Sequence, residues 1–240
     1  MLGLLAALGA RAAPLQARLH GDFMHYTFAL TWQPGFCGAD GGCLPDQPHT
    51  VLIGLHGLWA SRPQSLIRRG ISAPKWWSRG CDYYRHGHSP SDSAPPLPPA
   101  TLTRLNAVMP HLKDSLLTHE YDKHVQCFGF DPQNFFQTEL RMRSAVTGSP
   151  FGRYLTATAR GHEVRRAEVI QAFMRAFSTN QHSALQLRCE RNQRGQVVLT
   201  QLWITLYRDA LPRFPRGDSF MNAPIAQDNC PPRFQVPDWQ

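Results

Sequence analysis

The sequence predicts an α+β fold in which a central antiparallel sheet is flanked by several helices. Stretches that alternate between apolar and polar residues are mixed with stretches in which apolar residues recur every three or four positions. The two kinds do not follow the regular strand–helix order of a parallel α/β fold. Apolar residues make up 42% of the 240 residues, which is enough for one core, and no internal repeat marks a boundary. We therefore predict a single domain over residues 14–240.

Four stretches have the pattern of strands. Residues 25–32 alternate, and residues 51–58 form a nearly continuous apolar run, as in a central strand that is buried on both faces. Residues 185–189 and 197–207 alternate on either side of the turn sequence at 192–195, which predicts a hairpin.

Helical spacing recurs in three other stretches. Residues 101–112 have apolar residues three and four apart, with Thr101 as a candidate cap. A second helix should open at Asp131-Pro132, because proline is favoured in the first turn. Residues 165–177 repeat the pattern, whereas residues 62–99 predict a long irregular excursion over the surface.

The N-terminal residues 1–13 resemble a signal peptide. Ten apolar residues are followed by Ala10-Arg11-Ala12, and a short apolar stretch before Ala-x-Ala is typical of an export signal. The run is too short to span a bilayer. The usual basic start is missing, so a frayed apolar terminus is the alternative. We expect an exported protein, periplasmic or extracellular.

Six cysteines form an even set, which in an exported chain predicts three disulfides out of fifteen possible connectivities. Cys37 and Cys43 flank five small residues, a loop that they could close. No Cys-x-x-Cys occurs, so neither thiol redox chemistry nor a cysteine-rich zinc site is expected.

The strongest chemical signal is a run of four polar residues, His119, Glu120, Lys123 and His124. In an α-helix they would project at about 0°, 100°, 40° and 140°, all from one face. Such a face could move protons and hold an anion, although most charged runs are only solvated surface. A zinc site is the alternative interpretation of these residues. Because the zincin motif places its histidines four apart and here they are five apart, we predict no metal ligand.

Two segments resemble the active-site segments of the ribonuclease T2 family. His119–Cys127 is similar to the family's His-Glu-x-x-Lys-His-Gly-x-Cys, with Val125 in place of the glycine. Ile53–Ala60 is similar to its apolar strand running into His-Gly-Leu-Trp-Pro, with Ala60 in place of the proline. The two occur in the family's order, and Phe128–Pro132 resembles bacterial members. The likeness extends from Gly21 to the last cysteine.

The resemblance implies a disulfide-stabilised, ribonuclease T2-like fold. It also implies the remaining disulfides, Cys81–Cys127 and Cys189–Cys230. The first of these would anchor the C-terminal end of the catalytic helix.

The resemblance further implies a metal-independent endoribonuclease with no cofactor. His124 would be the general base and His56 the general acid. Glu120 and Lys123 would support the transition state, and His119 would contact the phosphate. The products would be 2′,3′-cyclic phosphates, which are hydrolysed to 3′-phosphates.

This chemistry fits the residue types. RNA carries its own nucleophile, the 2′-hydroxyl, so cleavage needs only a base, an acid and a group that stabilises charge at phosphorus. Histidine can act as either acid or base near neutrality. The net charge of +8 suits a polyanion. We expect a monomer that binds single-stranded RNA, cleaves no DNA and has no membrane span.

Trp59 is the candidate substrate-binding residue, because a tryptophan can stack on any base. Packing in the core is the compatible alternative. Adenine-preferring members of the family have an acidic residue two positions later, where this chain has Ser61. We therefore predict broad base specificity.

Two other functions stay open. One is a catalytically inactive relative that binds RNA or another polyanion, and the other is a zinc hydrolase that uses His119 and His124. Cleavage of RNA in the presence of EDTA would exclude both.

Overall fold

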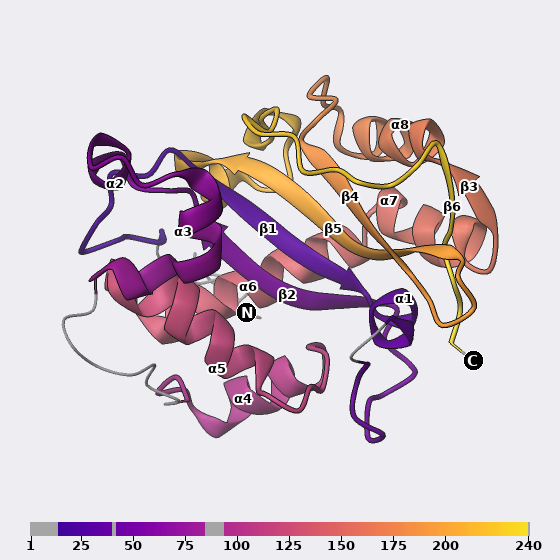
Figure 1. Cartoon of the computed structure of the whole chain (residues 1–240), viewed down its shortest axis with the longest axis horizontal. Coiled ribbons are helices and arrows are strands. Elements are labelled where there is room, and N and C mark those ends of the chain that lie inside the picture. The colour runs from indigo at the N-terminus through magenta and orange to yellow at the C-terminus, as the bar shows by residue number, and fades with distance from the viewer. Residues whose placement is uncertain (1–13, 40–41, 85–93, 240) are drawn as a thin grey trace, which may run out of the picture.

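The computed structural model describes residues 14–39, 42–84 and 94–239. Residues 1–13, the signal-peptide-like segment, lie outside this part of the chain. The class is α+β, as predicted, with one sheet that carries helices around it (Figure 1). In the described ranges, no helix is both long and apolar enough to cross a membrane.

The sheet has six strands in the described part of the chain. They are β1 (His25–Trp32), β2 (Ile53–Ala60), β3 (Glu163–Arg165), β4 (Leu185–Arg191), β5 (Val197–Tyr207) and β6 (Arg233–Gln235). Their order is β2-β1-β5-β6-β3, and β4 also pairs with β5. Every pairing is antiparallel except the short contact between β5 and β6.

Eight α-helices surround the sheet in the described ranges. They are α1 (Gln33–Gly38), α2 (Gln64–Arg68), α3 (Ala73–Arg79), α4 (Pro99–Asn106), α5 (Leu116–Glu120), α6 (Pro132–Thr147), α7 (Pro150–Arg153) and α8 (Arg166–Phe177). α6 runs behind β2 and β1 and packs on β2, whereas α7 and α8 lie at the far end of the sheet (Figure 1).

Most predicted elements are found within two residues of their expected bounds. α6 begins as expected, because the Asp131 carboxylate accepts a hydrogen bond from the amide of Asn134 and Pro132 follows in the first turn. The helix predicted over residues 101–112 is wrong in its length. It starts earlier, with Thr101 inside the first turn, and it ends at Asn106, shortly before Pro110.

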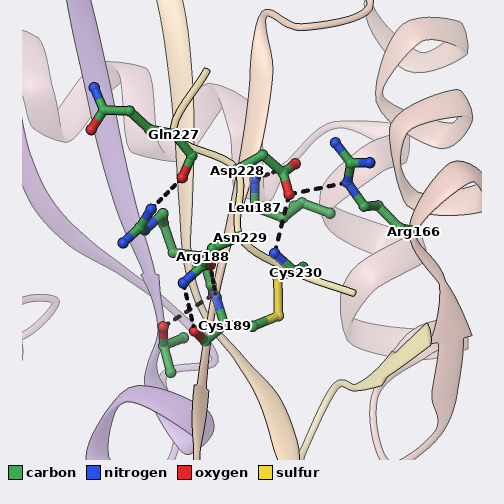
Figure 2. The surroundings of a disulfide bond; sticks show 9 residues. Arg166, Leu187, Arg188, Cys189, Gln227, Asp228, Asn229 and Cys230 are labelled. Carbon is green, nitrogen blue, oxygen red and sulfur yellow. Dashed lines mark hydrogen bonds and ion pairs between the residues drawn. A yellow bond between two sulfur atoms is a disulfide. The ribbon is translucent and has the colours of Figure 1, made fainter. Parts of the chain in front are cut away.

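All three predicted disulfides are present: Cys37–Cys43, Cys81–Cys127 and Cys189–Cys230. The last one ties β4 to the C-terminal segment (Figure 2). Beside it, the side chain of Asn229 accepts from the amide of Cys189 at 2.8 Å and donates to its carbonyl at 3.0 Å. The disulfide and this paired bond together fix the segment along the strand.

The disulfides should differ in how much they stabilise the fold. Cys189 and Cys230 are 41 residues apart in sequence, whereas Cys37 and Cys43 are 6 apart. Closing the longer loop removes more entropy from the unfolded chain, so replacing both cysteines of that pair by alanine should cost about 4 kcal/mol, against about 2 kcal/mol for the shorter loop. Urea unfolding of the two double variants measures this. An equal or larger loss for the short loop would contradict it.

Candidate active site

The segment that carries most of the candidate residues is helical, but its winding changes. α5 begins after Ser115, whose hydroxyl accepts a hydrogen bond from the amide of Thr118 at 3.3 Å. The chain then widens into a π-helix over Tyr121–Val125 and tightens into a 3₁₀ turn over Gln126–Phe128. The prediction of one regular α-helix is therefore wrong here. Single π turns of this kind are frequent at functional sites.

The π-helix brings His119 and His124 close together. In a π-helix, residues five apart lie roughly above one another, whereas α-helical geometry would separate these two by about 140°. The amide of Gln126 bonds to the carbonyl of Tyr121, which is the five-residue repeat. The centroids of the two imidazole rings are 6.1 Å apart.

This geometry removes the spacing argument against a metal. His119, Glu120 and His124 each offer one ligand atom, and these atoms lie within 4.8 Å of one another. Two imidazoles and a carboxylate are a donor set that zinc accepts. RNA cleavage needs no metal. Because the spacing of the histidines no longer excludes a zinc site, the test for one is whether a chelator removes the activity.

His56 reaches the site because β2 has a bulge. Ala29 pairs with Gly57 and Leu30 pairs with Leu55, so His56 is an extra residue in the ladder. A bulge resets the alternation of a strand and re-aims a side chain. Leu55 and Leu58, three residues apart, are therefore both in the core, whereas His56 lines the cavity.

Glu120 connects the two segments. Its side chain is only 2% exposed. Oε2 accepts a hydrogen bond from the Trp59 indole at 2.6 Å, and Oε1 lies 3.3 Å from Nε2 of His56. A Cβ at Gly57 would lie 2.0 Å from Glu120 Oε2. The glycine makes room for the carboxylate.

Trp59 packs among the imidazoles. Its ring centroid is 5.3 Å from that of His56 and 5.5 Å from that of His124. Phe36 and Trp203 were not singled out from the sequence. The ring centroid of Phe36 lies 6.0 Å from that of His56, and the ring centroid of Trp203 lies 5.2 Å from that of Trp59. Both pairs meet edge-on. Neither had a local signal, since each is an ordinary aromatic residue in its segment.

The Cys81–Cys127 disulfide anchors the end of the helical segment, as expected. Next to it, Gly80 has a φ of +49°, which favours glycine. A Cβ at Gly80 would lie 2.3 Å from the carbonyl oxygen of Lys123. This close approach fixes the backbone from which the Lys123 side chain projects to the cavity.

Burial controls the ionisation of the site. Desolvation lowers the pKa of His124 to about 4, although the Glu120 carboxylate opposes this shift. Desolvation also lowers the pKa of His119. For Glu120, burial would raise the pKa, but His124 and His56 outweigh it and lower the pKa overall. His124 is therefore a neutral imidazole and Glu120 a carboxylate at pH 7.

Glu139 is a buried carboxyl group that sequence reasoning missed. It is 1% exposed, in α6 behind β2. Burial raises its pKa well above the usual value, and repulsion by Glu120 adds to this, while the Leu58 amide opposes it. The signal was its position three and four residues after Phe136 and Phe135, on the apolar face of the helix.

The six predicted site residues line one cavity of about 540 Å³: His56, Trp59, His119, Glu120, Lys123 and His124. Glu120 is the only acidic residue among the described residues that line it, whereas Lys123 and Arg62 are basic. A cavity of this size and charge suits a small anion or part of a polyanion.

Sequence comparison gives two matches. The profile of the Ribonuclease T2 family matches residues 23–216. Ribonuclease I of Escherichia coli (strain K12) is 30% identical over an alignment 256 residues long, which covers 98% of this chain and 94% of that protein.

Three solved structures of ribonucleases have a similar fold. The SF11-RNase of Nicotiana alata aligns with a TM-score of 0.62 at 17% identity, covering 90% of this chain and all of that one. RNase NT in complex with 5′-AMP gives 0.60 at 17% identity, covering 90% and 98%. Ribonuclease MC1 from bitter gourd seeds gives 0.56 at 18% identity, covering 89% and 100%. At these identities the structures bear on the fold alone.

The raised pKa of Glu139 predicts a stability effect that depends on pH. The folded state keeps this proton to higher pH than the unfolded state. The stability it contributes is thus complete below the unfolded pKa and is lost as pH rises through the folded pKa. Glu139→Gln cannot ionise. Thermal unfolding from pH 5 to 8 should show an advantage for the variant that widens with pH, by at most about 1.4 kcal/mol per pH unit.

The matched control is Glu190→Gln, which removes an exposed carboxylate from β4. Two results would contradict the assignment of a buried neutral carboxyl. One is a stability advantage over the wild type that widens equally with pH in this control. The other is an advantage that narrows with pH for Glu139→Gln.

Proposed function

Because this chain belongs to the ribonuclease T2 family and is an endoribonuclease, we propose that it cleaves single-stranded RNA by transesterification without a metal ion. The 2′-oxygen attacks the neighbouring phosphorus and the 5′-oxygen leaves, which gives a 2′,3′-cyclic phosphate. Water then opens the ring to a 3′-phosphate. The observation that carries the proposal is the pair of imidazoles, His56 and His124, around the buried carboxylate of Glu120.

His124 is the general base of this proposal. Its lowered pKa of about 4 keeps the imidazole neutral at physiological pH, which is the form that accepts the 2′ proton. His56 is the general acid. The Glu120 carboxylate, 3.3 Å from Nε2, orients the imidazole that donates to the departing 5′-oxygen. When the cyclic phosphate is hydrolysed, the two histidines exchange roles.

Lys123 and His119 complete the site. Both line the same cavity as the two proton-transfer residues. The ammonium group of Lys123 neutralises negative charge that develops on the phosphoryl oxygens. His119 contacts the phosphate and fixes its orientation between the base and the acid.

The substrate is unpaired RNA of any sequence. A base that stacks beside Trp59 must be free of a duplex, and stacking tolerates every base. The hydroxyl of Ser61 accepts from the amides of Met24 and His25 at 3.0 and 3.2 Å, so it is engaged with β1. The site therefore offers no carboxylate at that position to select adenine.

The cellular setting follows from the covalent structure. Three disulfides are typical of an oxidising compartment, which supports an exported protein in the periplasm or outside the cell. The six site residues come from one chain, which supports a monomer.

A zinc-dependent hydrolase is the second candidate, because the ligand atoms of His119, Glu120 and His124 lie within 4.8 Å of one another. The two candidates differ in their response to a chelator. An inactive polyanion-binding relative would cleave nothing under either condition.

Incubation with total RNA in EDTA should give full cleavage, because the nucleophile comes from the substrate. The products should end in 2′,3′-cyclic phosphates and then 3′-phosphates after all four bases, and single-stranded DNA should remain intact since it lacks the 2′-hydroxyl. Loss of activity in EDTA that returns with zinc would favour the hydrolase instead.

His56→Ala and His124→Ala should each lower kcat by at least about 100-fold, the usual worth of a proton-transfer group. In the wild type, kcat/KM should be bell-shaped in pH, and its acidic limb should have a midpoint near 4, because His124 must lose its proton to act as base. His124→Ala should remove that limb. A limb centred near 6.5, or one that survives in the variant, would contradict the assignment.

A further inference from the structure

The catalytic cavity continues across the sheet, beyond the proton-transfer residues. Gly57 on β2 pairs with Ala29 on β1, Ala29 pairs with Trp203 on β5, and Trp203 pairs with Gln186 on β4. Both Trp203 and Gln186 line the cavity. Three strand spacings of about 4.8 Å place Gln186 about 14 Å from the strand that carries His56.

We call this far end the β4 lobe. It is formed by Gln186, Trp203, Met221, Ile225 and Gln227. Ile225 is 43% exposed, and Met24, Ile67 and Trp77, which are also exposed, line the same cavity. In the described ranges, four of the seven large exposed apolar side chains thus gather around one opening, which is where a ligand would cover them.

The wall of the β4 lobe is held in place before any ligand arrives. Residues 227–230 run along β4 (Figure 2), and the amide of Asn229 donates to the carbonyl of Leu187. The amide of Gln227 donates to Oε1 of Gln186, and the Arg188 guanidinium donates to the Gln227 carbonyl oxygen and lies 4.8 Å from the centroid of the Trp203 ring. Below them, Asp228 accepts from the Leu187 amide at 3.1 Å.

The Cys189–Cys230 disulfide and the ion pair between Arg166 and Asp228, at 3.0 Å, fix the end of this wall (Figure 2). A site that is already ordered loses little entropy when it binds, so the lobe is suited to recognition.

Gln186 has the chemistry of a residue that recognises a ligand through hydrogen bonds. It is only 3% exposed, and its amide oxygen is occupied by the Gln227 amide. Its amide nitrogen bonds to no atom of the residues that the structure describes, and the side chain lines the cavity. The group therefore presents two donors and no free acceptor. A partially buried donor without a partner favours a ligand that brings an acceptor.

We propose that the β4 lobe is an additional base-binding subsite. It takes a base of the RNA strand that lies beyond the two nucleotides joined by the cleaved bond, and Gln186 donates to a carbonyl or ring nitrogen of that base. Guanine O6 and N7 and uracil O4 are acceptors of this kind. Met221 and Ile225 cover the faces of the base. The subsite rests on the proposed ribonuclease function and determines specificity along the strand.

The test uses oligonucleotides with one ribonucleotide, so that one bond can be cleaved. A dimer of ribouridine followed by deoxyadenosine is compared with trimers extended by deoxyguanosine at the 5′ or the 3′ end. One trimer should exceed the dimer in kcat/KM by about tenfold, mainly through KM, the worth of one hydrogen bond to a buried donor.

Gln186→Glu keeps the oxygen that Gln227 needs and removes the donors. It should abolish the gain on extension to within about twofold, while cleavage of the dimer stays within about twofold of the wild type. Gln193→Glu makes the same charge change on an exposed turn residue and should keep the gain. Ile225→Ser, on the exposed wall, should also reduce the gain and serves if Gln186→Glu does not fold.

Two results would overturn the subsite. One is an equal increase in kcat/KM from dimer to trimer in the wild type, Gln186→Glu and Ile225→Ser. The other is an effect of Gln186→Glu on cleavage of the dimer alone. Binding of an all-deoxy trimer, measured by tryptophan fluorescence, tests the subsite separately from the catalytic proposal. If no ribonucleotide substrate is cleaved but Gln186→Glu still weakens binding of the trimer relative to the dimer, the catalytic proposal fails and the subsite stands.

Discussion

The buried carboxylate of Glu120 is the constraint on which the rest of the site depends. A charge with 2% exposure is costly unless its oxygens have partners. Here the partners come from another segment of the chain: the Trp59 indole at 2.6 Å and the His56 imidazole at 3.3 Å. In the proposed mechanism, the contacts that hold this carboxylate also hold the imidazole of the general acid.

Several local irregularities serve this carboxylate. The bulge at His56 turns the imidazole out of the apolar core, and Gly57 leaves the space into which the carboxylate fits. On the other segment, the π-helix places His124 beside His119, whereas an α-helix would turn the two side chains in different directions. Each irregularity weakens regular backbone pairing. The Cys81–Cys127 disulfide and the close packing of Gly80 on the backbone of Lys123 hold the irregular helix against the rest of the fold.

The sheet then extends the site beyond catalysis. β2 presents His56 and Trp59 at one end of the cavity, and β4 and β5 present Gln186 and Trp203 at the other. Because the strands pair directly, the distance between His56 on β2 and Gln186 on β4 is set by the spacing of the strands. The Cys189–Cys230 disulfide gives the C-terminal wall the same rigidity.

The sequence by itself, with its resemblance to the family, predicted the class of fold and the three disulfides, which are confirmed, and it supplied six candidate site residues, which line one cavity. Periodicity located β1, β2, β4, β5 and α6, because burial on one face leaves a pattern that residues carry locally. The two active-site segments carried their residue types in order. Only the tertiary structure decided the π-helix, the bulge and the position of Gln186 in the cavity. These depend on contacts between segments distant in sequence, such as Glu120 with Trp59 and Gln186 with Gln227, and a local pattern of residues does not encode such contacts.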